Sequence, residues 1–394
     1  MYEKILVCLD NSEDACAGVD VALAIAEKTA ARVTGCHVYA ARLHDERFRQ
    51  MESGLPEKYQ NEEELKRQRE THDTLIDKGL RIISDSYMSV LASRAQGRGV
   101  EVSEVSREGK NYAEIVREAA EGRYDLVVLG ALGLGKVERS RIGTVCERVV
   151  RRLSTDVLVA RARGGGRRAK IAVAVDGSPR SFGALAAALE LAPRLGASVE
   201  AVSAFDPDFH YTAFNSIATV LSDEAGKVFK FKEQEKLHEE IIDKGLAKIY
   251  RDHLDTAERM ASRAGTEIST VLLSGKAFDE LVSYAERERP LMMVMGKTGF
   301  HADGGLDIGG NTENCLRELP CHLLITSREV TAGDGGEKEV EQLLWTDDAI
   351  DMLGRVPPFV RGVVKNLVEE TARKEGLRKV TAPFMERVRK RMKM

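Results

Sequence analysis

The feature that most constrains this chain is an internal repeat with a constant offset of 166 residues. The string Ile-Asp-Lys-Gly-Leu occurs at 76–80 and again at 242–246. An apolar run that ends in aspartate occurs before Asp10 and again before Asp176. Self-similarity at one fixed period indicates one structural unit used twice. We therefore expect two domains of the same fold, at 1–162 and 167–328, with a smaller third domain at 340–394.

Each copy alternates short apolar runs with helical patterns. In the first copy the predicted strands are 5–9, 33–39, 101–106, 126–129 and 156–160. Runs that are apolar throughout are typical of parallel strands covered on both faces, and helices between them predict right-handed βαβ units. The expected fold class is α/β, with two tandem five-stranded parallel-sheet domains of Rossmann-like type.

Two charged segments interrupt this alternation. The segment 41–69 is dense in charge, and we expect an exposed, partly helical excursion followed by a long helix at 70–94. A matching excursion is expected at 205–232 in the second copy. The glycine-rich stretches at 163–168 and 331–337 are flexible by composition and are predicted to be linkers.

A glycine loop follows the fourth strand of the first copy. Gly130, Gly133, Gly143 and Thr144 have the spacing G-x2-G-x9-G-T. Glycines let a ligand approach the backbone closely, and the helix that starts at Thr144 presents free amides and a positive dipole end to an anion. A tight strand-to-helix turn without a ligand gives the same pattern, so the loop alone leaves both interpretations open.

Aspartates end the first strand of each copy. Ligands of open parallel sheets lie outside the carboxyl ends of the strands, where strand order reverses. Asp10 and Asp176 lie at such ends, where a carboxylate can accept from a ribose hydroxyl. Capping of the following helix is an equally good interpretation of both residues.

Several chemistries have no support in the sequence. Lys297-Thr298 resembles the end of a P-loop, but position 291, where that motif needs glycine, is leucine. The six cysteines have no zinc-like spacing and are expected to be reduced core thiols. His72 and His238 occupy matching helical positions without carboxylate or cysteine neighbours at ligand spacing. We expect no catalytic residues and no metal site made of protein side chains alone.

Charge and hydropathy argue against nucleic acid and membranes as partners. A net charge of −4 gives no bulk attraction for nucleic acid or anionic membranes. No run reaches the ~18 apolar residues of a membrane span, and the chain begins with a strand instead of a charged leader and apolar segment. We therefore expect a cytoplasmic protein.

With these residues assembled, both copies resemble the universal stress protein family, over 1–162 and 167–328. ATP-binding members carry G-x2-G-x9-G-[ST] after the fourth strand of a five-stranded parallel sheet, and the first copy fits that motif completely. The resemblance implies that Leu9, Val38 and Leu129 line an adenine pocket, that Val145 lies near the phosphates, and that Asp10 is the family's aspartate after the first strand.

The second copy departs from the motif, because Gly310 stands where serine or threonine is expected. Its candidate residues are Asp176, Val202, Gly296, Gly299, Gly309, Asn311 and Thr312. The loops also differ in charge. Lys136, Glu138, Arg139 and Arg141 give the first a net charge of +2, and Asp303 and Asp307 give the second −2, of which Lys297 offsets one. Because such charges interact by a few kcal/mol near a surface, we expect the first site to bind ATP and the second to bind it weakly or not at all.

The last sixty residues resemble the helical C-terminal domain of the B subunit of light-independent protochlorophyllide reductase. The residues that carry this likeness are Trp345-Thr346, Arg355-Val356-Pro357-Pro358-Phe359-Val360-Arg361 and Val380-Thr381. Without cluster-binding cysteines the tail is expected to be a docking module of three short helices, not a reductase.

The resemblance implies a non-catalytic stress or regulatory protein. The ligand is ATP, with ADP or AMP as alternatives and Mg²⁺ accompanying it, and ligand binding is expected to order the loop 134–142 for an unidentified protein partner. Domains of this family pair through their last strands, which predicts an internal pseudo-dimer through 156–160 and 321–326, with a homodimer as a further alternative. Two rivals stay open: a slow ATPase or adenylyl-transferring enzyme that uses Glu138, and a nucleotide-independent scaffold that uses the charged excursions.

Overall fold

The computed structural model describes two compact units, Met1–Ala332 and Gly333–Met394. The described residues are 2–59, 61–162, 169–207, 243–300, 302, 305–331, 344–354, 356, 364–365, 367–369, 371–372, 375, 377 and 379–391. The predicted linker at 163–168, nearly all of the excursion at 205–232 and nearly all of the predicted linker at 331–337 lie outside them.

The first repeat alternates strands and helices in the expected order. Its strands are β1 (Lys4–Cys8), β2 (Arg32–Tyr39), β3 (Val102–Glu108), β4 (Leu126–Gly130) and β5 (Asp156–Ala160). Its helices are α1 (Glu13–Thr29), α2 (Ala41–Met51), α3 (Glu62–Ala95), α4 (Asn111–Gly122) and α5 (Thr144–Arg152), with the short 3₁₀ turns η1 (Glu52–Gly54) and η2 (Glu57–Tyr59) between α2 and α3.

The second repeat follows the same plan. Its strands are β6 (Lys170–Ala174), β7 (Ser198–Phe205), β8 (Ile268–Ser274), β9 (Met292–Gly296) and β10 (His322–Thr326). Its helices among the described residues are α6 (Pro179–Leu195), α10 (Asp243–Arg263), α11 (Ala277–Glu288) and α12 (Gly310–Glu318).

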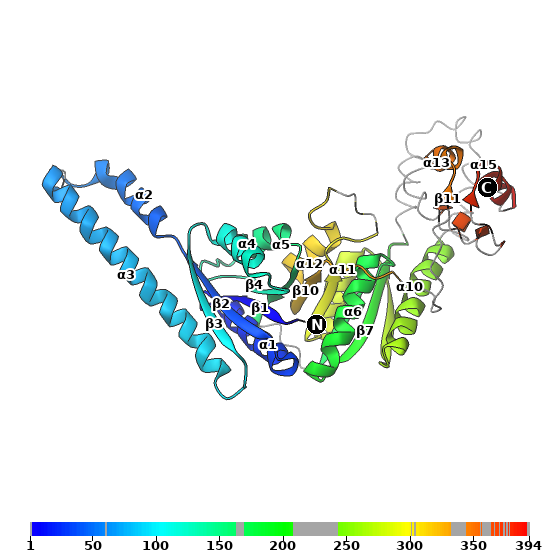
Figure 1. The fold of residues 1–394 in the computed structure, drawn as a ribbon, viewed down its shortest axis with the longest axis horizontal. Coiled ribbons are helices and arrows are strands. Elements are labelled where there is room, and N and C mark those ends of the chain that lie inside the picture. Colours follow the sequence, from blue (N-terminus) through cyan, green and yellow to red (C-terminus); the bar gives the residue numbers. More distant parts are fainter. Residues whose placement is uncertain are drawn as a thin grey trace. The chain divides into compact units, whose positions relative to one another are not determined.

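The two repeats share one ten-stranded sheet, with the order β3-β2-β1-β4-β5-β10-β9-β6-β7-β8 (Figure 1). Strands within each repeat are parallel, whereas β5 and β10 pair antiparallel, with Leu158 opposite Leu324. The expected pairing of the two last strands within the chain is confirmed. Strand order reverses at β1 and at β6, and the crevice for a ligand in such sheets lies at that point.

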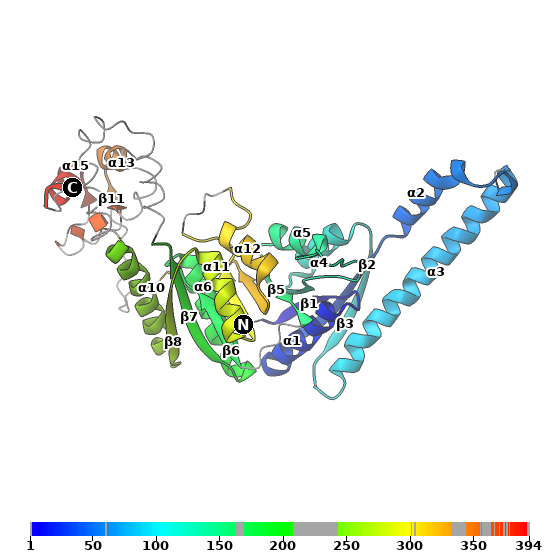
Figure 2. The ribbon, with the colours of Figure 1, turned by 180° about the vertical axis from the view of Figure 1, so that it is seen from behind.

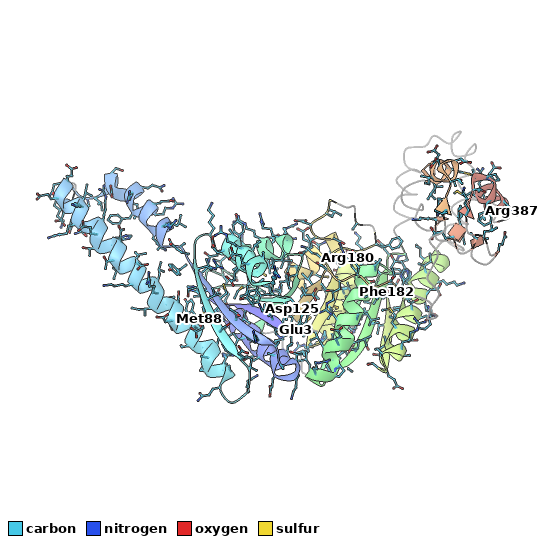
Figure 3. All side chains as sticks on the ribbon, viewed as in Figure 1. Glu3, Met88, Asp125, Arg180, Phe182 and Arg387 are labelled. Carbon is cyan, nitrogen blue, oxygen red and sulfur yellow. The ribbon has the colours of Figure 1, made fainter. Side chains whose placement is uncertain are left out.

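Helices cover both faces of this sheet (Figures 1 and 2). One face packs against α1, α3, α6 and α10, and the other against α4, α5, α11 and α12. Because α1 and α6 contact each other, a single apolar cluster runs through both repeats and includes Leu23 and Leu185, both fully buried. The view with side chains shows Phe182 on α6 and Met88 on α3 in this layer (Figure 3).

Helix α3 is longer than the sequence predicted. It begins at Glu62, not near residue 70, because the side chain of Asn61 accepts a hydrogen bond from the Glu64 amide and acidic residues fill the first turn. The C-terminal part packs on β2 and β3 through Met88, Leu91 and Ala95, while the N-terminal part contacts α2 beyond the sheet (Figure 1). The excursion is therefore helical for most of its length.

The C-terminal unit has helices α13 (Asp347–Gly354) and α15 (Ala382–Arg391) among its described residues. Two strands of two residues each, β11 (Leu344–Trp345) and β12 (Lys379–Val380), pair in parallel. The sequence predicted only helices here, because a two-residue strand shows no periodicity. Phe384 and Val388 of α15 join Ala349 of α13 in a small core.

Charged side chains hold the two repeats together beside the β5–β10 junction. Arg151 donates to Asp307 at 3.0 Å and to Glu313 at 2.5 Å, and Lys297 donates to the Arg151 and Leu153 carbonyls at 3.0 and 2.6 Å. The first-repeat residues in these pairs lie in or next to α5, and the second-repeat residues lie in α12 and in the segment between β9 and α12. The junction thus combines backbone pairing with ion pairs that cross it.

His322 makes this junction sensitive to acid. It is 3 % exposed, its Nδ1 accepts a hydrogen bond from the Arg161 amide at 3.1 Å, and burial lowers its pKa from 6.5 to about 4. A neutral ring in the folded state means that protonation favours unfolding. The stabilisation is complete above pH 6.5, the unfolded value, and is lost as the pH falls towards 4.

We expect the unfolding free energy of the wild type to fall by up to about 3 kcal/mol more than that of His322→Asn between about pH 7 and pH 4. Asparagine keeps an acceptor for the Arg161 amide but does not titrate. Urea denaturation at several pH values measures the difference. His44→Asn, a change at an exposed histidine of α2, serves as the control, and equal pH profiles for wild type and His322→Asn would contradict the assignment.

Candidate functional site

A cavity of about 470 Å³ opens at the carboxyl ends of β1, β2 and β4. All nine residues predicted for the first site line it: Leu9, Asp10, Val38, Leu129, Gly130, Gly133, Gly143, Thr144 and Val145. The volume falls within the range of small-molecule sites, about 300–1,000 Å³. The structure therefore brings together every first-domain residue that the sequence nominated.

The three motif glycines lie where a side chain does not fit. A Cβ at Gly130 would lie 2.7 Å from the Ala15 amide nitrogen, and one at Gly133 would lie 2.6 Å from Asp10 Oδ2. At Gly143 the Ala131 carbonyl oxygen would be 3.1 Å away. Gly130 is thus fixed by packing against α1, while Gly133 keeps space open beside the aspartate.

Asp10 is not the cap of the following helix. Ser12 is the N-cap of α1, where its Oγ accepts from the Ala15 amide at 3.2 Å, and Asp10 Oδ1 accepts from the Ser12 amide at 3.0 Å. Among the described residues no hydrogen bond reaches Asp10 Oδ2. One carboxylate oxygen thus holds the turn, and the other remains available at the cavity.

The N-terminus of α5 also borders the cavity. Gly143 is the N-cap and supplies no side-chain acceptor, while its own amide donates to the Ala131 carbonyl at 2.7 Å. The first amides of an α-helix have no intrahelical partner, and the dipole gives that end a partial positive charge. Thr144 and Val145 therefore present backbone donors to a bound anion.

Residues that the sequence did not nominate complete the lining. They include Cys8, Cys36, His37, Asn111, Ile115, Lys136, Ser140, Ile142 and Cys146. His37 and Cys36 directly precede Val38 on β2, so extending the family comparison along that strand would have found them. Burial raises the pKa of the Cys36 and Cys146 thiols to about 12, which keeps them protonated, in line with the expectation of reduced thiols.

A second, smaller cavity of about 210 Å³ lies at the equivalent place in the second repeat. It is lined by all seven predicted residues: Asp176, Val202, Gly296, Gly299, Gly309, Asn311 and Thr312. Asp176 is fully engaged here, because Oδ1 accepts from the Ser178 amide at 3.0 Å and Oδ2 accepts from the Phe300 amide at 2.9 Å. The glycine loop is therefore tied directly to the aspartate.

Two further hydrogen bonds occupy polar groups of the second cavity. The guanidinium of Arg180, labelled on α6 in Figure 3, donates to the Thr298 hydroxyl at the start of the glycine loop. The Thr312 hydroxyl, which stands two positions beyond the expected one, donates to the Gly296 carbonyl at 2.9 Å. These polar groups satisfy one another instead of facing a ligand.

The charge argument from the sequence is not supported by the observed contacts. Asp303 lies outside the described residues, and the charge of Asp307 is offset by Arg151 of the first repeat. Lys297 points to backbone carbonyls of the first repeat, and burial lowers its pKa. Among the described residues, the two sites differ in cavity size and in internal hydrogen bonding.

Comparison with known proteins agrees with this geometry. The model of the universal stress protein family matches residues 1–161 and 168–327. The chain belongs to the universal stress protein family. A second family model, described as proto-chlorophyllide reductase 57 kD subunit, matches residues 345–389, so the tail is similar to part of that subunit.

Individual relatives are distant. Universal stress protein MJ0531 of Methanocaldococcus jannaschii is 27% identical over 89 residues, 23% of this chain, and the chain spans 52% of its length. A universal stress protein of Archaeoglobus fulgidus has 14% identity and a TM-score of 0.51, covering 82% of this chain and 98% of its own. A putative universal stress protein of Pseudomonas aeruginosa has 17% identity and a TM-score of 0.48, covering 82% and 93%. The Archaeoglobus structure shows the shared tandem fold.

None of the described helices is both long enough and apolar enough to span a bilayer. Within the same part of the chain, no three histidine, cysteine, aspartate or glutamate side chains gather as metal ligands would.

The packing at Gly130 gives a stability prediction. We expect Gly130→Ala to lower the unfolding free energy by about 1–3 kcal/mol, because its Cβ would press on the α1 backbone. Gly135→Ala is the matched control in the same loop, since nothing lies within 4 Å of its Cβ. Urea denaturation measures both variants, and an equal effect of the two substitutions would show that the close approach to Ala15 does not constrain the loop.

Proposed function

We propose that this universal stress protein is a non-catalytic ATP-binding regulator whose first domain holds the nucleotide. The observation that carries the proposal is the 470 Å³ cavity, whose lining includes Asp10, with a free carboxylate oxygen, and the helix N-terminus at Thr144. A carboxylate suits ribose hydroxyls, and a helix N-terminus suits phosphates. ADP or AMP fits the same polarity, and Mg²⁺ is expected to accompany the phosphates.

Binding without turnover is the simplest use of this cavity. The rival enzyme needs a base near the terminal phosphate, and Glu138 is an exposed loop residue that does not line the cavity. Burial also keeps the Cys36 and Cys146 thiols of the lining protonated, and a thiol is a far weaker nucleophile than a thiolate. These observations support a role in which occupancy itself is the signal.

A calorimetric titration of nucleotide-stripped full-length protein with ATP and Mg²⁺ tests the proposal. We expect about one site per chain. Gly133→Ala is expected to weaken binding about tenfold or more, because its Cβ would displace Asp10 Oδ2 and cost a charge-assisted hydrogen bond to the ligand.

Gly299→Ala is the matched control, since its Cβ would crowd Asp176 by the same geometry in the second repeat. It is expected to leave the titration unchanged. Two equal sites would contradict the asymmetry, and the absence of any adenine-nucleotide binding would favour the scaffold alternative.

The signal is proposed to leave through the loop 134–142. Leu134 and Val137 are apolar but 62% and 69% exposed, which suits contact with a protein partner. Lys136 forms an ion pair with Glu13 at 3.1 Å, which connects the loop to α1. A ligand changes this surface only by binding one loop arrangement more tightly than another.

Hydrogen exchange with and without ATP checks that step. We expect slower exchange of the amides at 134–142 and in the first turn of α5, because bound phosphate would fix these donors. The corresponding segment after Gly299 is an internal control and is expected to exchange at the same rate in both states. No change in either segment, at saturating ATP, would refute signalling through the loop.

A further inference from the structure

His37 introduces a polar group into the first cavity that the proposed function does not yet use. It lies near the end of β2, lines the cavity beside Val38, and is partly buried. Its ring makes an edge contact with Tyr87 of α3, with centroids 4.8 Å apart and planes at 81°. The imidazole is therefore held in a defined orientation at the cavity.

The hydrogen bonds around His37 fix where its proton lies. Ser84 Oγ is 3.0 Å from the Leu80 carbonyl oxygen, which can only accept, so the one hydroxyl proton points there. With the hydroxyl proton in that bond, Ser84 Oγ accepts from His37 Nδ1, 2.7 Å away. A neutral imidazole that donates at Nδ1 carries its lone pair on Nε2.

The ring is held neutral by its surroundings. Burial lowers the His37 pKa from 6.5, and the nearby carboxylate of Asp10, at the end of β1, opposes the shift without cancelling it. Tyr87 and Ser84 of α3 face the ring as neutral groups, and β3 places Ser106 opposite it. Among the described residues Nε2 has no hydrogen-bond partner. It is also not one of the polar side-chain atoms that are fully buried without a hydrogen bond.

The second repeat lacks this acceptor. Ser203 occupies the position that corresponds to His37 and is 1% exposed. Its hydroxyl donates to the Val175 carbonyl at 2.6 Å, so it is used inside the fold. Only the larger cavity combines a free carboxylate oxygen with a free imidazole nitrogen among the described residues.

We propose that His37 is a specificity-determining residue of the first cavity, whose neutral Nε2 accepts a hydrogen bond from a donor on the nucleoside part of the ligand. The donor is a ribose hydroxyl or the amino group of the base, since phosphate oxygens are acceptors and have no proton to share with Nε2. The inference rests on the proposed nucleotide binding. It also orients the ligand, with the nucleoside at β1 and β2 and the phosphates at α5.

Calorimetric titration of the full chain with ATP tests the inference. His37→Phe keeps a ring but removes the acceptor, and is expected to weaken binding about three- to tenfold. His37→Gln restores an acceptor and is expected to bind within about threefold of the wild type. His44→Phe, at an exposed position of α2, is the matched control and is expected to have no effect.

The pH dependence of ATP affinity distinguishes a hydrogen-bond acceptor at position 37 from a side chain that only fills space. Protonation of His37 removes the lone pair, and its pKa is lowered from 6.5. Wild-type affinity is therefore expected to fall as the pH drops below about 6.5 towards 4.5, by more than the affinity of His37→Gln. The Gln variant reports the titration of ATP itself and serves as the reference at each pH. Identical profiles for the two proteins would overturn the assignment.

Nucleotide analogues identify the donor. Titrations use 2′-deoxy-ATP, 3′-deoxy-ATP and the triphosphate of purine riboside, which lacks the amino group. The loss caused by His37→Phe is expected to vanish for the analogue that lacks the partner group, as a double-mutant cycle requires. Wild type that binds no adenine nucleotide would defeat the proposed function and this inference together. Wild type that binds ATP as tightly as His37→Phe would overturn this inference alone.

Discussion

The antiparallel pairing of β5 with β10 is the constraint on which the rest of the structure depends. Each repeat buries its sheet between two helical layers, but its last strand would leave an edge with unpaired backbone groups. Joining the two edges satisfies those groups within one chain and forms the ten-stranded sheet. The same junction brings Arg151 next to Asp307 and places Lys297 against carbonyls of the first repeat.

This junction explains how two equal domains come to have unequal sites. Lys297 follows the glycine-loop strand β9, yet its ammonium is used to hold the first repeat, not to meet a phosphate. Asp14 accepts from the Leu132 amide in the first repeat, whereas its counterpart Arg180 donates to Thr298 in the second. Equivalent positions therefore contact the two loops in opposite hydrogen-bonding roles, as an acceptor in the first repeat and as a donor in the second.

Helix α3 ties the charged excursion to the first cavity. Its C-terminal part packs on β2 and β3, and Ser84 and Tyr87 of that part set the proton and the orientation of His37. The helix α2 begins two residues after β2 ends, so the strand that lines the cavity leads directly into the excursion. The proposed nucleotide site and the excursion thus share one structural element instead of being separate features.

The sequence by itself determined the repeat, the α/β class and the glycine loop of the first cavity. It could do so because a fixed offset, apolar runs and a glycine spacing are local patterns. Leu9, Val38, Leu129 and Val145 were expected at that cavity only from the family resemblance. The cap at Ser12, the start of α3 at Glu62 and the strands β11 and β12 were missed or misassigned, since a single side-chain hydrogen bond or two paired residues leave little periodic trace.

Only the tertiary structure decided the partners of the charged side chains. Net loop charge suggested an electrostatic difference between the two sites, but Arg151 is 156 residues from Asp307 in the chain, and no pattern in the sequence predicts that they meet. The tautomer inferred for His37 likewise depends on Ser84, 47 residues away. Side chains that act across a sheet junction or between a strand and a distant helix are set by packing, and packing is what the sequence alone leaves undetermined.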